Sequence, residues 1–195
     1  MIAVVKYDAG NVRSVLNALD RAGARDVVLT SDPELLRSAS KVILPGVGEA
    51  STALESLRKE GLDTLIPTLT NPVLGICIGL QLLCQASEEG NVRGMGVFPA
   101  HVRRFVPGEG IKVPHMGWNS LSQLEGPLFK GIDEDTYFYF VHSYRADICE
   151  DTAAVCDHGG KFSAAICRGN FYGVQFHPEK SGAAGERVLK NFLAI

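Results

Sequence analysis

The sequence predicts an α/β fold with a mostly parallel central sheet and a second half that is rich in β-strands. In the first third of the chain, short β-rich runs alternate with amphipathic helical stretches, which is typical of parallel strands covered by helices. Beyond Gly90, strand-like runs separated by Gly, Pro and Asp replace this alternation. Of the 195 residues 46% are hydrophobic, and neither a repeat nor a linker interrupts them. We therefore expect residues 1–195 to form one domain with its own core.

Strands and helices take turns in the first half of the chain. Asn11 favours a helix N-cap, and Val12, Val15, Leu16 and Leu19 recur behind it at helical spacing. The other elements predicted here are strands at 2–5, 27–29, 41–44 and 73–76, a helix that begins at Ser31-Asp32-Pro33, and helices at 53–60 and 80–86.

The second half is predicted to be mostly strands, closed by one helix. The strands are expected at 102–106, 118–121, 136–141, 153–156, 162–167 and 171–176. The final helix, at 181–194, places Val188, Leu189, Phe192 and Leu193 on one face.

Composition and charge exclude several classes of protein. The formal net charge of −3 does not suggest a nucleic acid as the main partner. No apolar run reaches the roughly 18 residues that span a bilayer, and Lys6 interrupts the N-terminus before it resembles a signal peptide. Five cysteines without a Cys-x-x-Cys pair suggest reduced thiols, not a disulfide framework or a zinc site. We expect a soluble, cytoplasmic protein with no metal and no other cofactor.

A candidate nucleophile lies at the predicted junction of a strand and a helix. Gly75-Ile76-Cys77-Ile78-Gly79 has a small residue on each side of a central nucleophile, the pattern of a sharp turn that presents the middle side chain. The N–H groups and the dipole at a helix N-terminus favour a thiolate. The pattern predicts that Cys77 is catalytic. The alternative is a buried cysteine that only packs, as most free cysteines do.

A base for this nucleophile is predicted at the end of the strand at 171–176. Residues i and i+2 of an extended chain point to the same side, and Pro178 makes the chain rigid between His177 and Glu179. Glu179 could therefore hold one ring nitrogen of His177 while the other nitrogen faces Cys77. Taken alone, without the adjacent carboxylate, His177 is better interpreted as a structural histidine.

The turn Pro45-Gly46-Val47-Gly48 is a candidate oxyanion hole. Its glycines free the backbone to direct amides at a substrate oxygen, and the amide of Ile78 after the nucleophile would supply a second donor. The simpler interpretation is an ordinary turn between a strand and a helix.

Together, the elbow cysteine, the Pro-Gly-x-Gly turn and Phe176-His177-Pro178-Glu179 resemble the class I (triad) glutamine amidotransferases over nearly the whole chain. The resemblance implies the three-layer sandwich of that family and a reaction that hydrolyses glutamine to glutamate and ammonia through a thioester. It makes Cys77 the nucleophile, His177 the base and acid, and Glu179 its orienting carboxylate. It further implies an oxyanion hole at Val47, Gly48 and Ile78 and substrate contacts at Gly46, Gln81, Glu89, Ser143 and Tyr144.

Within that class, the strings at 112–119, 139–144 and 176–181 resemble the glutaminase subunits of imidazole glycerol phosphate synthases in histidine biosynthesis. The resemblance implies a heterodimer with a (β/α)₈ cyclase subunit, which uses the ammonia to make imidazole glycerol phosphate and AICAR. Free ammonia would be protonated and diluted in water, and 195 residues are too few for both active sites, so a partner is expected. The expected interface residues are Asn11, Met116, Trp118, Tyr139 and Lys180.

Simpler interpretations remain for part of this interface, and the first loop departs from the family. Met116 and Trp118 could instead pack in the core, and Lys180 could be a solvated charge. Lys6-Tyr7-Asp8 stands where the family has Asp-Tyr-Gly.

Three other functions remain open at this point. The chain could serve a different synthase of the same class, for example one for anthranilate, guanylate or pyridoxal phosphate. It could be a peptidase or γ-glutamyl hydrolase that releases its product to water. It could also be a binding module that keeps the fold without the reaction. The string at 114–119 argues against the first, and the presence of Cys77, His177 and Glu179 argues against the last.

Overall fold

The first half of the chain builds the parallel part of a central sheet, as the sequence predicts. The computed structural model describes residues 1–8, 12–46 and 48–195, so the expectations for Asn11 and Val47 lie outside the described residues. In chain order the elements are β1 (Ile2–Val5), α1 (Val12–Arg21), β2 (Val27–Thr30), α2 (Pro33–Ser38), β3 (Lys41–Leu44), α3 (Ala50–Lys59), α4 (Leu62–Leu65), η1 (Ile66–Thr68), β4 (Val73–Ile76) and α5 (Ile78–Leu83). Strand β1 pairs in parallel with β2 and β3, and β3 pairs in parallel with β4.

The second half extends this sheet with mostly antiparallel strands. Its elements are β5 (Cys84–Ser87), η2 (Glu89–Asn91), β6 (Val92–Arg93), β7 (Phe98–Arg104), β8 (His115–Ser120), η3 (Pro127–Phe129), β9 (Tyr137–His142), β10 (Tyr144–Ala146), β11 (Thr152–Asp157), β12 (Lys161–Arg168), β13 (Phe171–Val174), η4 (Pro178–Lys180) and α6 (Gly182–Leu193). Among the described residues the sheet runs β2-β1-β3-β4-β13-β12-β10-β7-β5-β6, with β11 paired to β12. Strand β13 returns beside β4 in parallel and so joins the two halves.

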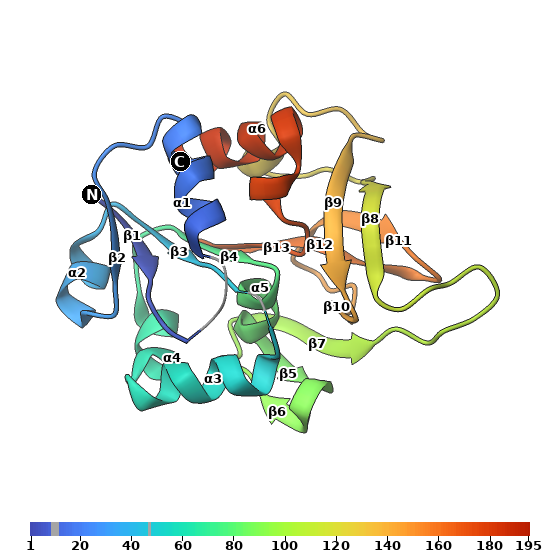
Figure 1. The fold of residues 1–195 in the computed structure, drawn as a ribbon, viewed down its shortest axis with the longest axis horizontal. Coiled ribbons are helices and arrows are strands. Elements are labelled where there is room, and N and C mark those ends of the chain that lie inside the picture. Colours follow the sequence, from blue (N-terminus) through green and yellow to red (C-terminus); the bar gives the residue numbers. More distant parts are fainter. Residues whose placement is uncertain (9–11, 47) are drawn as a thin grey trace.

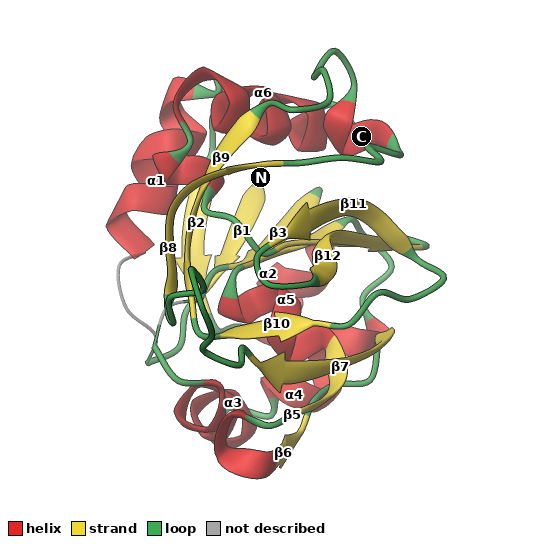
Figure 2. Ribbon diagram, turned by 90° about the vertical axis from the view of Figure 1, so that its right-hand side faces the viewer, coloured by secondary structure: helices red, strands yellow, loops and turns green. Residues whose placement is uncertain are grey.

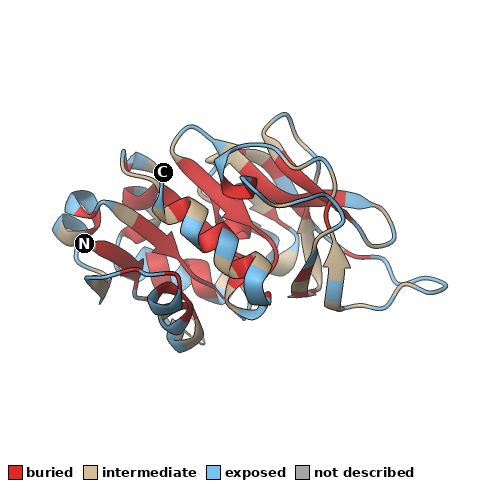
Figure 3. Cartoon of the chain, turned by 90° about the horizontal axis from the view of Figure 1, so that it is seen from above, coloured by how far each residue is buried: buried red, intermediate tan, exposed pale blue. Residues whose placement is uncertain are grey.

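Helices cover both faces of this sheet, which gives three layers. Helices α1 and α6 lie on one face, and α3, α4 and α5 lie on the other (Figures 1 and 2). Figure 3 shows that the strands between these layers are buried, whereas the helices expose their outer sides. Among the described residues, no helix is long and apolar enough to cross a membrane. The predicted fold class is confirmed.

Strands β8 and β9 form a separate two-stranded ribbon beside the second half of the sheet (Figure 1). The ribbon packs its buried residues Phe138 and Phe140 inward, against Phe176 just after β13. This packing brings the ribbon next to the segment that carries His177.

The predicted helix at 80–86 is wrong in its second half. Helix α5 ends at Leu83, Cys84 is extended, and the chain continues as β5 between β6 and β7. Pairing with β6 and with β7, which starts 14 residues after Cys84, replaces the helical hydrogen bonds there. Strand β10 and the short elements α4 and β6 were likewise not predicted. Helix α3 begins three residues earlier than expected, because the carboxylate of Glu89 accepts a hydrogen bond from the amide of Ala50 at 2.8 Å.

Candidate active site

Cys77 lies in a strained turn between β4 and α5. Its φ of 53° and ψ of −107° are rare for a residue with a side chain and cost about 1–3 kcal/mol. The turn is packed so closely that a Cβ on Gly75 would lie 2.6 Å from the carbonyl carbon of Gly79. A Cβ on Gly79 would lie 2.1 Å from the carbonyl oxygen of Leu44 on β3. The glycines predicted to flank the nucleophile are therefore required by close backbone contacts.

His177 and Glu179 form a buried pair next to Cys77. The ring Nδ1 of His177 lies 2.7 Å from Oε1 of Glu179, and the two side chains are only 1% and 4% exposed. Burial alone would lower the pKa of His177, but hydrogen bonds with Cys77 and Glu179 outweigh it and raise the pKa to about 10. A histidine that keeps its proton at neutral pH, between a sulfur and a carboxylate, is the arrangement of a proton donor to a leaving group. The structure thus brings the three predicted residues together.

Gly46, in the Pro-Gly-x-Gly segment, lies directly against the start of α5. Gly48 lines the cavity above Cys77, whereas Gly46 is buried. A Cβ on Gly46 would lie 2.7 Å from the Cβ of Ile78 and 2.8 Å from the amide nitrogen of Gly79. The turn and the residue after the nucleophile are therefore adjacent, as an oxyanion hole built from both requires.

Tyr7 forms a hydrogen bond with the same segment, although no motif in the sequence marks it as a site residue. Its hydroxyl donates a hydrogen bond to the carbonyl oxygen of Pro45. Burial, and then the neighbouring Cys77, raise the pKa of Tyr7, so the hydroxyl keeps its proton and remains a donor.

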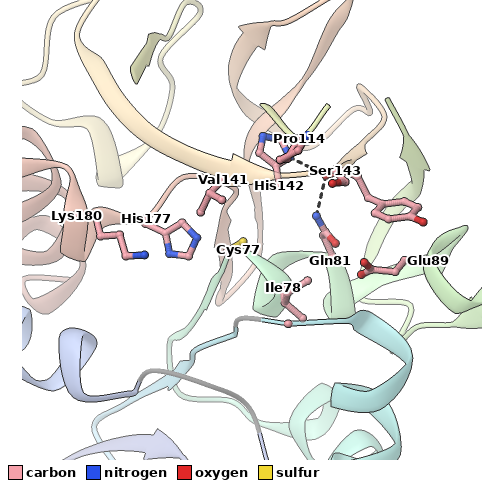
Figure 4. A pocket seen from close by; sticks show the side chains of 12 residues that line it. Cys77, Ile78, Gln81, Glu89, Pro114, Val141, His142, Ser143, His177 and Lys180 are labelled. Carbon is pink, nitrogen blue, oxygen red and sulfur yellow. Dashed lines mark hydrogen bonds between the residues drawn. The ribbon is translucent and has the colours of Figure 1, made fainter. Parts of the chain in front are cut away.

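A cavity of about 390 Å³ opens above the sulfur, a size that fits a small molecule. Figure 4 shows Cys77 at its centre, with His177 and Lys180 on one side and Gln81 and Glu89 on the other. Of the predicted substrate residues, Gln81, Glu89, Ser143 and Tyr144 line this cavity, and Gly46 does not. The other lining residues are Gly48, Ile78, Pro114, Val141 and His142.

The carbonyl oxygen of Tyr144 is held by two buried side chains. It accepts hydrogen bonds from Nε2 of Gln81 at 2.9 Å and from Nδ1 of His142 at 2.7 Å. The other nitrogen of His142 lies 2.9 Å from Nδ1 of His115, whose Nε2 lies 3.2 Å from the amide of Asn119. Burial is the largest cause that lowers the pKa of His142 to about 3 and that of His115 to about 4, so both rings are neutral at pH 7. The wall of the cavity is thus tied to strand β8.

The outer face of the β8–β9 ribbon is apolar and exposed. Met116, Trp118 and Tyr137 are 64%, 55% and 58% exposed. The amine of Lys180 lies 5.8 Å from the centre of the Tyr139 ring, which contacts Trp118 edge to face. Core packing of Met116 and Trp118 is therefore excluded.

Gln175 is a buried polar residue next to the nucleophile that the motifs in the sequence do not single out. It is fully buried, and its amide contacts Cys77. A signal was available, since Gln175 is the one polar side chain near the end of the apolar run Phe171–Phe176, where an amide has to find partners.

Comparisons with known proteins identify the family of this chain. Residues 4–195 match the model of the family described as glutamine amidotransferase class-I, and the chain belongs to that family. Several curated relatives of the chain are called imidazole glycerol phosphate synthase subunit HisH. The one from Bacteroides fragilis (strain YCH46) is 55% identical over 195 residues, which cover 100% of this chain and 99% of that protein. The one from Yersinia pestis is 47% identical and covers 98% and 99%.

Solved structures share the fold at lower identity. A structure described as glutamine amidotransferase has a TM-score of 0.77 at 20% identity, covering 99% of this chain and 97% of that one. PurLQS from Thermotoga maritima gives 0.69 at 20% identity, covering 99% and 97%.

Proposed function

We propose that this chain is the glutaminase subunit of an imidazole glycerol phosphate synthase. It hydrolyses glutamine to glutamate and ammonia and passes the ammonia to a (β/α)₈ cyclase subunit, which forms imidazole glycerol phosphate and AICAR in histidine biosynthesis. The observation that carries the proposal is the buried series of Cys77, His177 and Glu179 at the floor of a small cavity. The names of relatives that are 55% identical over the full chain support the particular synthase.

In the first half-reaction, the sulfur of Cys77 attacks the side-chain amide carbon of glutamine. The carbonyl oxygen becomes negative, and the amides of Ile78 and Gly48, together with that of Val47, are the proposed donors to it. The tetrahedral intermediate collapses when the C–N bond breaks and His177 gives its proton to the departing nitrogen. Ammonia leaves, and a glutamyl thioester remains on Cys77.

In the second half-reaction, the now neutral His177 removes a proton from water as the water oxygen attacks the thioester. The C–S bond breaks, glutamate forms, and the thiolate and the protonated imidazole are restored. Glu179 accepts the hydrogen bond of Nδ1 throughout, which keeps Nε2 directed at the sulfur.

Gln81, Glu89, Ser143 and Tyr144 are proposed to hold the amino-acid end of glutamine. Gln81 lines the cavity, and its Oε1 is buried without a partner among the described residues, so the side chain has an unused acceptor at the proposed substrate site. Glu89 lines the same side of the cavity, where burial is the main cause that raises its pKa.

The β8–β9 ribbon is proposed to bind the cyclase through Met116, Trp118 and Tyr139, together with Lys180 of η4 and Asn11 of the first loop. Exposed aromatic and Met side chains next to each other are the anchors that protein interfaces use. Lys180 both lines the cavity and contacts Tyr139, so the proposed interface begins at the edge of the cavity from which ammonia leaves.

The test combines this chain with the cyclase and compares two nitrogen sources. We expect Cys77→Ala to abolish formation of imidazole glycerol phosphate from glutamine and to leave formation from ammonium chloride at the wild-type rate. Cys167→Ala is the matched control and should change neither. Full glutaminase activity of the chain alone, with no binding to the cyclase, would instead favour a hydrolase that releases ammonia to water.

A further inference from the structure

Gln175 contacts the proposed nucleophile, Cys77, and has no role in the reaction described so far. Its side chain is 0% exposed, and Nε2 donates a hydrogen bond to Sγ of Cys77 at 3.6 Å. Its backbone is fixed as well, because its amide donates to the carbonyl oxygen of Ala164 at 2.8 Å. A buried amide of this kind is placed by its partners and has little freedom to leave them.

The orientation of the Gln175 amide follows from its neighbours. The carbonyl oxygen of Tyr144 can only accept, so the group of Gln81 that faces it at 2.9 Å is the NH₂ group. The same NH₂ group lies 2.9 Å from the Gln175 amide, so the Gln175 atom that faces it is Oε1. The NH₂ group of Gln175 then points at the sulfur. Gln81 thus donates to both the Tyr144 carbonyl and Gln175, and Gln175 in turn donates to Cys77.

A neutral donor on the sulfur complements His177. In the second half-reaction His177 takes a proton from water as the water attacks the thioester, and negative charge returns to the sulfur when the C–S bond then breaks. The side-chain amide of Gln175 does not lose a proton near neutral pH. Its NH₂ group can therefore donate a hydrogen bond to the sulfur of Cys77 in every step. Hydrogen bonds to charged groups are stronger than those to neutral ones, so the bond strengthens as the thiolate leaves.

We propose that Gln175 is a further catalytic residue of this reaction, a hydrogen-bond donor to Cys77 that stabilises the departing thiolate and is oriented by Gln81 and the Tyr144 carbonyl. The proposal rests on the glutaminase function proposed above. It also links the cavity to the nucleophile, because Gln81, which lines the cavity, is the residue that turns the Gln175 amide toward the sulfur.

The kinetic test uses Gln175→Met, which keeps the length and approximate volume of the side chain but has no hydrogen-bond donor. In the chain bound to the cyclase, we expect kcat per active site, counted by covalent labelling of Cys77, to fall about tenfold with KM within twofold. The exposed Gln85 on β5 provides the control, and Gln85→Met should leave both constants unchanged. A folded Gln175→Met protein with wild-type kcat per labelled site would overturn the proposal.

A second measurement does not depend on how Gln175→Met folds. In full-length protein labelled with ¹⁵N in glutamine side chains, the NH₂ resonances of Gln175 should move when Cys77→Ala removes the sulfur, whereas those of Gln85 stay in place. Unmoved Gln175 resonances would overturn the proposed bond. A wild-type chain that fails to hydrolyse glutamine with the cyclase present would instead refute the proposed function, and the NMR result would still decide the contact.

Discussion

The floor of the cavity and the β8–β9 ribbon are neighbours, but the side chains of the floor are buried and hydrogen-bonded to one another, whereas those on the outer face of the ribbon are exposed. On the floor, Cys77, His177 and Glu179 are nearly inaccessible and hydrogen-bonded to one another. On the ribbon, Met116 and Trp118 are more than half exposed, at 64% and 55%.

The difference separates what the chain does alone from what it does with another molecule. The floor is a set of reacting groups whose geometry the fold already holds, so changes there should alter turnover. The ribbon carries apolar area that only a second molecule can bury, so changes there should alter affinity. Four experiments test this division, beginning with the largest expected effect.

Glu179→Gln should show the strongest effect on the floor. An amide can donate as well as accept at the Nδ1 side, so the ring is no longer held with Nε2 toward sulfur. We expect kcat for glutamine in the reconstituted pair to fall roughly 10³- to 10⁴-fold, with little change in KM. Glu55→Gln, at an exposed ion pair with Lys59, should be neutral. If Glu179→Gln retained a tenth of the activity, Glu179 would not be the residue that orients His177.

Gly79→Ala tests whether the elbow is held by backbone contact. The new Cβ would lie 2.1 Å from the Leu44 oxygen, so β3 and α5 have to separate. We expect the free energy of unfolding to fall by about 3 kcal/mol, measured by denaturant titration. Gly108→Ala has open space around its Cβ and should stay within about 0.5 kcal/mol of wild type. Equal stability of the two variants would contradict the close packing of the elbow.

The sequence predicted those parts of the fold and site that depend on short-range patterns. The strands at 2–5, 41–44 and 73–76 were located correctly because each is a continuous apolar run between breakers. The elbow at Cys77 and the pairing of His177 with Glu179 follow from neighbours within two residues. The roles of these residues in catalysis stay predictions.

What the sequence missed depends on partners far along the chain. Gln175 contacts residues that are 94 and 98 positions away, and the early start of α3 depends on Glu89, 39 positions away. Helix α5 ends at Leu83 because β5 pairs with β7, not because of a local stop signal. Single-sequence patterns contain no information about which distant strand supplies such a partner.

Trp118→Ala tests whether the exposed face of the β8–β9 ribbon binds the cyclase. Trp118 is exposed, so its truncation should leave the melting temperature and the turn around Cys77 unchanged. Binding to the cyclase should weaken by at least about 2 kcal/mol, measured by calorimetric titration. Leu29→Ala on β2, which is also an exposed apolar residue at 40%, is the control and should bind normally. Unchanged affinity of Trp118→Ala would place the interface elsewhere.

The buried histidines behind the ribbon predict a loss of stability in acid. The pKa values of His115 and His142 are lowered to about 4 and about 3, below the ordinary 6.5, so the unfolded chain binds more protons between these limits. The free energy of unfolding should therefore fall as pH drops below 6.5, by up to about 1.4 kcal/mol per pH unit for each ring. His177, whose pKa is raised to about 10, works in the opposite direction just below pH 6.5, where the unfolded chain still gains protons at this ring, and adds nothing further once the unfolded ring is protonated as well.

Denaturant titrations at pH 6 and pH 5 measure this slope. His115→Gln should reduce it, whereas the exposed His101→Gln should not. A stability that is flat from pH 6.5 to pH 4 would show that the two rings are not held neutral.

Covalent labelling tests the central claim, that Cys77 is the nucleophile for glutamine, most directly. The chain is incubated with 6-diazo-5-oxo-L-norleucine, a glutamine analogue with an electrophilic carbon in place of the amide, and its peptides are mapped by mass spectrometry. Burial is the main cause that raises the pKa of Cys84 and Cys167, and that of Cys156 to about 12, so these thiols stay protonated. We expect a single adduct, on Cys77, and we expect excess glutamine to suppress it. An adduct on another cysteine, or none while glutamine is still hydrolysed, would contradict it.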